Sequence, residues 1–297
     1  MSIYTVYAAN LGGTLISGCT EEQEFDSGIE ETMIRGDGSP TVDEVVPERL
    51  SPEIRFGSTE IDALLDKISY AGWAIDPSAI LFCQKMTSTG RSTGSDHIRM
   101  TVNQGVVVPD ALAASQGAGG HAVMRGRIIP SWDGTNELIV PAAASLSGSP
   151  SVGKVFTVGP CKLNDAWITQ IQAINVAFNV GIDRHWSDGE GRPRELTLAT
   201  LSPVISITTT NVSILTSLGL VGTYGGANTV VYFTRCKGSD TSMRYGDNDS
   251  EHVSIAALGR VTVRRIGGTP QAAEIILQAK KVGSDPILDI TTGTTIA

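Results

Sequence analysis

Histidine and cysteine are the residue types of this chain best suited to bind zinc or to act in catalysis, and their spacing fits neither use. Zinc sites usually draw two ligands from a short motif such as H-x-x-x-H or C-x-x-C, and neither motif occurs. The residues concerned are His97, His121, His185, His252, Cys19, Cys83, Cys161 and Cys236. We expect reduced, isolated thiols, no metal site, no bound cofactor and no nucleophile elbow of the hydrolase type.

Two further groups of residues have the spacing of a binding motif. Asp247, Asp249 and Glu251 alternate like calcium ligands, but the run lacks the glycine and the distal glutamate of a calcium loop. Arg35-Gly36-Asp37 spells a cell-adhesion tripeptide, which an exposed turn explains equally well. We expect both to be solvated turns, and we expect the chain to have no catalytic residue and not to be an enzyme.

The charge balance argues against a nucleic-acid-binding protein. The formal net charge is −9, and proteins that grip nucleic acid need clustered Lys and Arg. The densest basic stretch, Arg260 to Arg265, alternates with Val261 and Val263 and is typical of one face of a strand. The first ten residues do not resemble a secretion signal, and no apolar run approaches the ~18 residues of a membrane span. We therefore expect no membrane binding.

The two halves of the chain resemble each other. Residues 51–64, SPEIRFGSTEIDAL, match residues 202–215, SPVISITTTNVSIL, at an offset of 202 − 51 = 151. In the same order, IYTV at 3–6 matches VFTV at 155–158, and AILFCQK at 79–85 matches TVVYFTR at 229–235.

Further matches continue this order along the chain. They are FDSGIE at 25–30 with FNVGID at 178–183, at an offset of 178 − 25 = 153, His97-Ile98 with His252-Val253, and DGTNELIV at 133–140 with VGSDPILD at 282–289. Small loop insertions explain the drift in offset. We therefore expect two copies of one unit, residues 1–150 and 151–297, joined through the linker-like segment 145–153.

Periodicity predicts that each copy is mainly β with one flanking helix. Alternation of period two over 124–128, 176–182 and 253–257 indicates strands with one face in the core. Helical spacing of apolar residues predicts helices over 59–68 and 211–219, with Ser58 or Thr59 as the first N-cap and Thr210 or Asn211 as the second. The expected fold is two tandem β-sandwich or partly closed barrel domains.

Two polar segments interrupt the strand pattern. Residues 18–50 are rich in Glu and Asp, and their counterpart 183–194 reads DRHWSDGEGRPR. Long polar segments in compact domains are usually functional or poorly ordered. We expect 18–50 to project as a hairpin or loop and to contact neighbouring subunits or successive rings.

One region resembles the tail tube proteins of long-tailed bacteriophages. The segment HIRMTVNQGVVVPDAL at 97–112, followed by AVMRGRIIPSWDGTNELIV at 122–140, has the strand, Asp-Gly-Thr-Asn turn and strand found in phage tail proteins. The resemblance covers the first copy best, and Gly283-Ser284-Asp285 replaces the turn in the second. The family implies a β-sandwich with one helix, assembled into stacked six-fold rings through which DNA passes.

The duplication departs from most members of that family, which carry one tube domain. Two fused copies imply a homotrimeric ring with pseudo-sixfold symmetry, because three chains supply six units. The resemblance further implies a structural virion protein of the phage tail, assembled in the host cytoplasm, that contacts other tail proteins. DNA would pass through an electronegative lumen without specific binding.

Three alternatives stay open. A distal tail or baseplate hub ring protein would share the fold and the threefold plan. A secretion-system tube protein would share the fold but is usually single-copy. A capsid decoration protein or a virion-associated hydrolase belongs to a different class, and a hydrolase could place one carboxylate of a catalytic pair on each copy.

Overall fold

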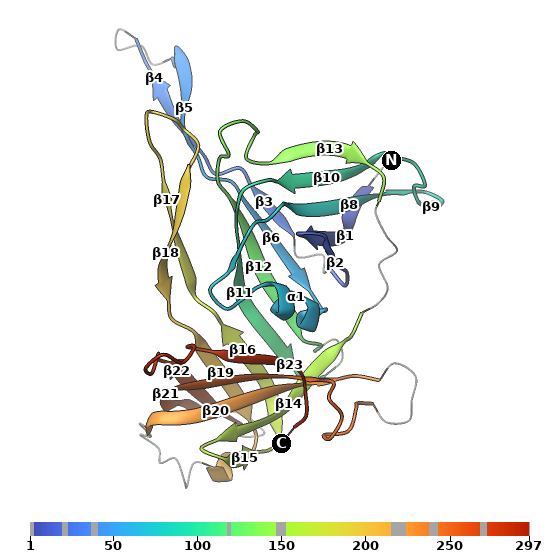
Figure 1. Cartoon of the computed structure of the whole chain (residues 1–297), viewed down its shortest axis with the longest axis vertical. Helices are drawn as coiled ribbons and strands as arrows, with labels where there is room; N and C mark the ends of the chain where they lie inside the picture. Colours follow the sequence, from blue (N-terminus) through green and yellow to red (C-terminus); the bar gives the residue numbers. More distant parts are fainter. Residues whose placement is uncertain are drawn as a thin grey trace.

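The protein is built almost entirely from antiparallel strands (Figure 1). The computed structural model describes residues 3–19, 23–36, 41–117, 120–146, 153–214, 224–237, 243–267 and 272–296. Within these ranges there is one α-helix, α1 (Ile61–Lys67). The expectation of a mainly β fold is therefore confirmed.

Thirteen strands precede residue 147 in the described part of the chain. They are β1 (Ile3–Leu11), β2 (Thr14–Ile16), β3 (Glu24–Asp26), β4 (Ile29–Ile34), β5 (Glu44–Leu50), β6 (Glu53–Ser58), β7 (Trp73–Ala74), β8 (Ala79–Thr87), β9 (Gly90–Arg91), β10 (His97–Val102), β11 (Gly105–Ser115), β12 (Val123–Pro130) and β13 (Val140–Ala144).

Ten strands follow. They are β14 (Phe156–Leu163), β15 (Ala166–Ile168), β16 (Ile171–Ala177), β17 (Val180–His185), β18 (Glu195–Leu201), β19 (Val204–Thr209), β20 (Tyr224–Arg235), β21 (His252–Gly267), β22 (Ala272–Ala279) and β23 (Asp289–Thr294).

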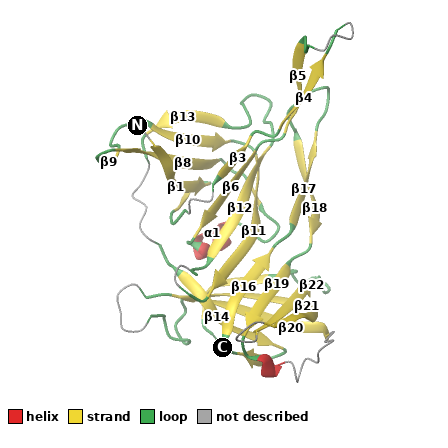
Figure 2. Ribbon diagram, turned by 180° about the vertical axis from the view of Figure 1, so that it is seen from behind, coloured by secondary structure: helices red, strands yellow, loops and turns green. Residues whose placement is uncertain are grey.

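These strands form two large sheets and two hairpins. The six-stranded sheet runs β13-β10-β8-β1-β2, with β9 beside β8. The 13-stranded sheet runs β15-β14-β20-β21-β22-β19-β16-β11-β12-β6-β3, with β23 beside β21 and β7 beside β11. β4–β5 and β17–β18 are separate two-stranded hairpins that extend along the long axis of the molecule (Figure 2). Strands from both sides of the expected boundary thus share one sheet, and residues 147–152, where that boundary falls, lie outside the described residues.

The predicted alternation of apolar residues places one face of each strand in the core. β19 and the first six residues of β22 alternate strictly between buried and partly exposed side chains. Phe56, Leu112, Phe178 and Phe233 are almost fully buried and belong to one apolar cluster that spans both halves of the chain. The core is therefore continuous across the chain.

The first predicted helix is present, but its predicted cap is wrong. α1 buries Ile61, Leu64 and Leu65, as its periodicity indicates. The N-cap is Glu60, which makes no side-chain capping bond, because its carboxylate accepts a hydrogen bond from the backbone N–H of Ser17 at 2.8 Å. Ser58 Oγ instead accepts from the N–H of Glu60 itself at 3.1 Å, just before the helix.

The second predicted helix, 211–219, lies mostly outside the described residues. Its described part contains a single 3₁₀ turn, Val212–Ile214. Thr209 Oγ1 accepts a hydrogen bond from the backbone N–H of Asn211 at 2.9 Å, so Thr209 plays the part of Ser58 in the first half.

Strand pairing follows the same order in both halves of the chain. The pairs β1–β2, β1–β8, β8–β10 and β10–β13 recur as β14–β15, β14–β20, β20–β21 and β21–β23. The pairs β11–β12, β12–β6, β6–β3 and β4–β5 recur as β21–β22, β22–β19, β19–β16 and β17–β18. β21 therefore corresponds to β10 and β11 together.

The pairing register also repeats. Ile54 lies opposite Ile128, and Ile205 lies opposite Leu277. The bulge in β11 between Pro109 and Ala111 recurs in β21 between Val263 and Arg265. A bulge is a specific local feature of a strand, so its recurrence at matching positions supports the correspondence strongly.

One sequence match is wrong by two residues. Phe25 lies opposite Ile54, and Val176 lies opposite Ile205, so Phe25 corresponds to Val176 rather than to Phe178. The match of 25–30 with 178–183 failed because a shift of two residues keeps every side chain on the same face of a strand. The apolar pattern therefore could not distinguish the two registers.

Candidate assembly interface

β11 and β16 form a seam that joins the two halves of the chain. Ala111 to Ser115 pair antiparallel with Ala177 to Ala173. Leu112 lies opposite Val176, and both side chains are fully buried. The seam thus combines backbone hydrogen bonds with an apolar contact that closes the core.

Backbone hydrogen bonds continue past both ends of this pairing. The N–H of Phe178 donates to the carbonyl of Asp110 at 2.9 Å, and the N–H of Gln116 donates to that of Gln172 at 2.7 Å. The sheet is consequently unbroken from one half to the other.

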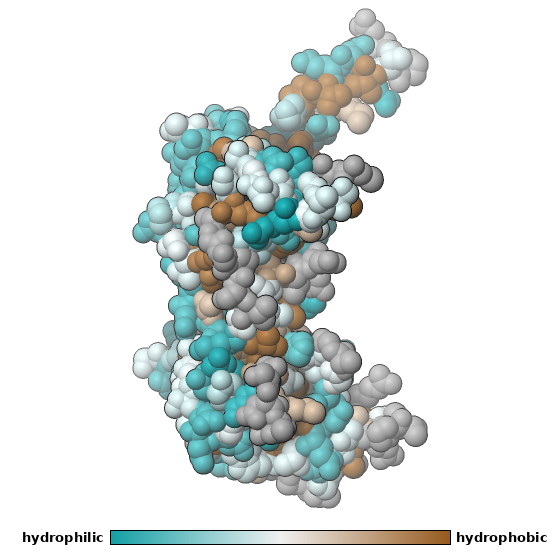
Figure 3. All heavy atoms as spheres, turned by 90° about the vertical axis from the view of Figure 1, so that its right-hand side faces the viewer, coloured by the Kyte–Doolittle hydropathy of each residue, from teal (hydrophilic) through white to brown (hydrophobic). Residues whose placement is uncertain are grey.

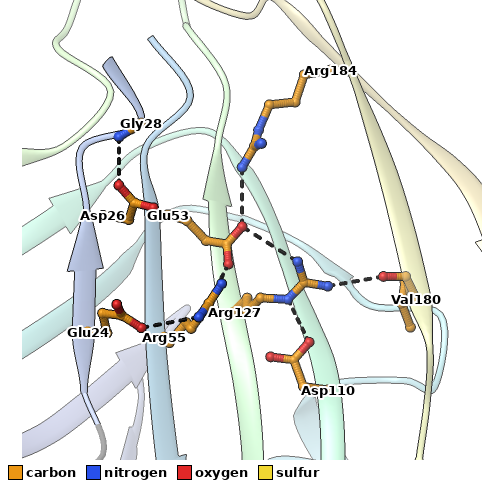
Figure 4. Close-up of polar contacts among 9 residues, drawn as sticks. All are labelled: Glu24, Asp26, Gly28, Glu53, Arg55, Asp110, Arg127, Val180 and Arg184. Atoms are coloured by element: carbon orange, nitrogen blue, oxygen red, sulfur yellow. Dashed lines mark hydrogen bonds and ion pairs between the residues drawn. The ribbon is translucent and has the colours of Figure 1, made fainter. Parts of the chain in front are cut away.

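A partly buried charge network lies across the seam (Figure 4), on the face of the sheet opposite to the buried Met124 and Ile128 of β12. Arg127 Nε donates to Asp110 Oδ1 at 2.6 Å, and its Nη2 donates to the carbonyl of Val180 at 3.1 Å. Glu53 Oε2 lies 3.5 Å from Arg127 Nη1 and 3.4 Å from Arg184 Nη2. Arg127 therefore links β11 and β12 to β17 of the other half.

Burial changes the pKa of one of the two acids in this network. Loss of hydration raises the pKa of Asp110, although the Arg127 guanidinium opposes the rise. Arg184 Nε is buried and has no hydrogen-bond partner among the described residues. This atom has therefore lost its hydration without a compensating hydrogen bond.

The end of the β17–β18 hairpin packs on the first half of the chain. The N–H of Leu50 donates to the carbonyl of Gly191 at 2.8 Å, and the N–H of Trp132 donates to that of Pro193 at 2.7 Å. The guanidinium of Arg49 lies 5.0 Å from the ring of Trp186. This hairpin, residues 180–201, is thus held against its neighbouring unit.

The corresponding β4–β5 hairpin, whose strands comprise residues 29–34 and 44–50, projects away from the body of the protein (Figure 1). The expectation that 18–50 projects as a hairpin holds for this part. Figure 3 shows apolar side chains gathered on the projecting hairpin. The exposed apolar residues of this region are Phe25, Ile29, Met33, Ile34, Val42 and Val45.

The residues singled out for chemistry do not converge. His97 and His252 are buried at matching positions, where each Nδ1 accepts a backbone N–H, from Lys85 at 2.9 Å and from Arg235 at 3.3 Å. His185 bonds Thr197 on the β17–β18 hairpin, and His121 is exposed beside β12. The two buried histidines therefore accept backbone hydrogen bonds from neighbouring strands and have a structural role.

The acidic run 247–251 makes local contacts. Asp249 Oδ2 accepts a hydrogen bond from the N–H of Gly246 at 2.7 Å, and Glu251 forms ion pairs with Arg235 and Lys154. No group of three or more His, Cys, Asp or Glu side chains within the described ranges is arranged to hold a metal ion. Asp37 of the Arg-Gly-Asp triplet lies outside those ranges.

The chain contains one G-x-S-x-G spacing, which corrects the expectation that no such motif occurs. It is Gly90 to Gly94, GRSTG, in the connection between β9 and β10. A nucleophile elbow needs a strand-to-helix turn, and strands lie on both sides here. Ser92 Oγ donates to Asp96 Oδ1 at 2.7 Å rather than to a histidine, so the segment is a structural turn.

The cysteines are separate and reduced. All four are free thiols. Burial raises the pKa of Cys19 to about 12 and also raises the pKa of Cys161. Both thiols are therefore protonated at neutral pH and are poor nucleophiles.

No family model matches the chain, and no curated protein matches it. No helix in the described part of the protein combines the length and the apolar character needed to cross a membrane. The repeated topology and the seam between the halves therefore carry the functional interpretation.

Proposed function

We propose that this chain is a structural subunit that assembles side by side with its own copies into closed rings. The observation that carries the proposal is the strand order β3-β6-β12-β11-β16-β19-β22-β21. Four strands from each half lie consecutively in one sheet, and the two equivalent groups meet at the β11–β16 seam. One unit-to-unit junction is thus built within a single chain.

When two equivalent units meet head to tail, the edge that each unit uses at the junction stays open on the other unit. β3 pairs only with β6, and residues 262–267 of β21 pair only with β22, within the described part of the chain. Exposed sheet edges are usually blunted or covered in native proteins. Repeated head-to-tail contacts close into rings when the rotation per unit allows it.

The more specific form of the proposal is a tail tube subunit of a long-tailed bacteriophage. The duplication supports a homotrimeric ring with pseudo-sixfold symmetry, in which three chains supply six units. Rings would stack into a tube within the virion, contact other tail proteins, and let DNA pass through the lumen. The resemblance of residues 97–112 and 122–140 and the projecting β4–β5 hairpin support this form.

Ion pairing of arginine side chains would reduce the affinity of the lumen wall for DNA. On the side of the shared sheet facing away from the core, Arg55 pairs with Glu24 and Glu53, and Arg127 pairs with Asp110. A paired arginine has less charge to offer a phosphate, so fewer counterions are released on contact. An electronegative lumen remains a prediction for the assembled ring.

Electron microscopy and mass measurement of the purified protein test the proposal. We expect rings or stacked tubes with three chains per ring and pseudo-sixfold symmetry. Six chains per ring would overturn the stoichiometry. Single rings that never stack would favour a distal tail or hub protein, and a protein that stays monomeric at high concentration would overturn ring formation itself.

A further inference from the structure

We propose that the junction between chains repeats the seam within the chain: the end of β21 pairs antiparallel with β3 of a second copy, with Ile266 opposite Phe25. The inference rests on the proposed self-assembly and specifies its interface. Each open edge would pair with the opposite open edge of the same sheet on an identical chain.

The pairing register fixes which residues correspond. In β11, Leu112 lies opposite Met124, and in β21, Ile266 lies opposite Ala273 at the same distance beyond the shared bulge. Ile266 therefore corresponds to Leu112. Phe25 corresponds to Val176, as shown by their pairing with β6 and β19. The seam pair Leu112–Val176 thus maps onto Ile266–Phe25.

Exposure of these side chains fits an interface that is open in the single chain. Leu112 and Val176 are both 0% exposed, whereas Ile266 is 38% exposed and Phe25 is 52% exposed. Both members of the second pair are apolar, and each would be covered by the other. Phe25 shares a hollow beside the open strand edge with the exposed Tyr4, and a group of exposed apolar side chains marks a contact site.

A hollow beside β3 supports the same contact. It is lined by apolar and polar side chains that include Tyr4, Phe25, Leu81 and Met100. Tyr4 is 44% exposed, whereas Phe156, its counterpart in β14, is buried next to the seam, where its carbonyl accepts the N–H of Ala122. The first half of the chain therefore covers the end of the core at β14, whereas the equivalent end at β1 is exposed.

The two edges also have complementary charge. Arg264, on the β21 edge, has a side chain that is 70% exposed and lies 3.9 Å from the carboxylate of Glu274 on the same chain. Asp26 is exposed on β3, and so is Glu24, which also pairs with Arg55. Opposite charges on facing strands favour the correct pairing and disfavour pairing of either edge with itself.

The same correspondence assigns a place to the β4–β5 hairpin. β17–β18 packs on the first half of its own chain through Arg184 and Glu53. Their counterparts by register are Met33, which is exposed, and Val204, which is partly buried. We infer that the β4–β5 hairpin lies on β19 of the neighbouring chain in the ring, with an apolar contact in place of the ion pair.

Disulfide cross-linking tests the register. Ala113 lies opposite Asn175 in the seam, and their counterparts Gly267 and Glu24 would face each other across chains. Residues directly opposite in antiparallel strands are close enough for a disulfide. The double variant Glu24→Cys/Gly267→Cys should form covalent dimers and trimers when assembled rings are oxidised, and neither single variant should do so.

A matched control shifts one cysteine by a single residue. In Glu24→Cys/Ile266→Cys the two side chains would lie on opposite faces of the sheet, so cross-linking should fall at least tenfold. Rings that form without cross-linking in the first double variant, or that link equally in the control, would overturn the seam and leave ring formation intact. A wild-type chain that never associates would overturn both.

Hydrogen exchange of the wild-type protein provides a test without substitutions. Backbone amides of residues 24–27 and 265–267 should exchange at least tenfold more slowly in the assembled protein than in the dissociated chain. The amides of residues 111–115 and 173–177 should change little, because their seam exists in both states. Unchanged exchange at β3 and β21 would contradict the proposal.

Discussion

His97 and His252 occupy equivalent positions in the two halves, and each uses Nδ1 to accept the backbone N–H of a cation-bearing residue on the adjacent strand. The donors are Lys85 at 2.9 Å and Arg235 at 3.3 Å. Each histidine also follows an acidic residue that forms an ion pair with that same donor, Asp96 with Lys85 and Glu251 with Arg235. The same arrangement of acid, histidine and paired cation therefore occurs once in each half of the chain.

Replacing either histidine with alanine should destabilise the fold. A buried N–H left without its acceptor costs about 1–3 kcal/mol, and the partly buried N–H groups here should cost less than the upper value. His252→Ala should cost more than His97→Ala, because His252 Nε2 also lies 2.8 Å from the carbonyl of Gly246. Denaturant unfolding measures both, and His97→Asn, whose side-chain oxygen can replace Nδ1, should recover part of the loss. Equal stability of wild type and both alanine variants would refute a structural role.

The Asp96–Lys85 contact should make stability depend on acid pH. Hydrogen bonds from Lys85 and then Ser92 lower the pKa of Asp96 to about 2. Because the folded pKa is depressed, the contribution to stability is present above the unfolded pKa of about 4. It is lost as pH falls from about 4 to 2. Unfolding temperatures across this window should fall less steeply for Asp96→Asn than for wild type, and an identical slope would exclude the contact as a cause.

Gly105 and Gly259 should not tolerate a side chain. They correspond by register, and an added Cβ would lie 2.2 Å from the carbonyl oxygen of Ile129 and 2.1 Å from that of Gln278. Alanine at either position should therefore destabilise the chain by about 1–3 kcal/mol through displaced backbone. Gly267→Ala is the control, since nothing lies within 4 Å of its added Cβ. In the unassembled chain this control should unfold like wild type, and tolerance of alanine at 105 and 259 would contradict the tight strand contact.

Removing the Arg127 side chain should weaken the seam between the halves. Arg127→Ala would leave Asp110 and Glu53 partly buried without their shared cation, which costs about 3 kcal/mol. Arg127→Lys should retain some of the charge pairing but lose the bond to the carbonyl of Val180. Urea unfolding of the two variants should rank alanine below lysine below wild type. A lysine variant as stable as wild type would show that the bond to Val180 is dispensable.

Deleting residues 27–46 should leave a folded protein that no longer assembles normally. Most of the deleted segment belongs to the β4–β5 hairpin, whose strands pair only with each other in the described part of the chain. The unfolding temperature should therefore change little, while rings or stacks seen by electron microscopy should be lost. The matched control removes only the hairpin tip, residues 35–42, and keeps the exposed residues Ile29 and Met33. Normal assembly of the longer deletion would contradict a role for the hairpin.

The sequence by itself determined the local structure and the internal repeat. Alternation in 176–182 and 253–257 predicted strands because one face of each is buried, and period two records that directly. Ile61, Leu64 and Leu65 predicted α1 for the same reason at helical period. The match of 51–64 with 202–215 identified the correct register, since Ser-Pro followed by a strand and a turn leaves few alternative alignments.

Only the tertiary structure decided how the two halves join. Backbone pairing of β11 with β16 depends on two edges meeting in space, and edge hydrogen bonds leave no signature in side-chain periodicity. The register of Phe25 was equally hidden, because a shift of two residues preserves the apolar face. Glu60 makes no side-chain capping bond because Ser17, distant in sequence, donates a hydrogen bond to its carboxylate. The exposed residues Phe25 and Ile266 can be identified as a contact pair only by comparison with the buried pair Val176 and Leu112. Only the fold brings Val176 and Leu112 into contact.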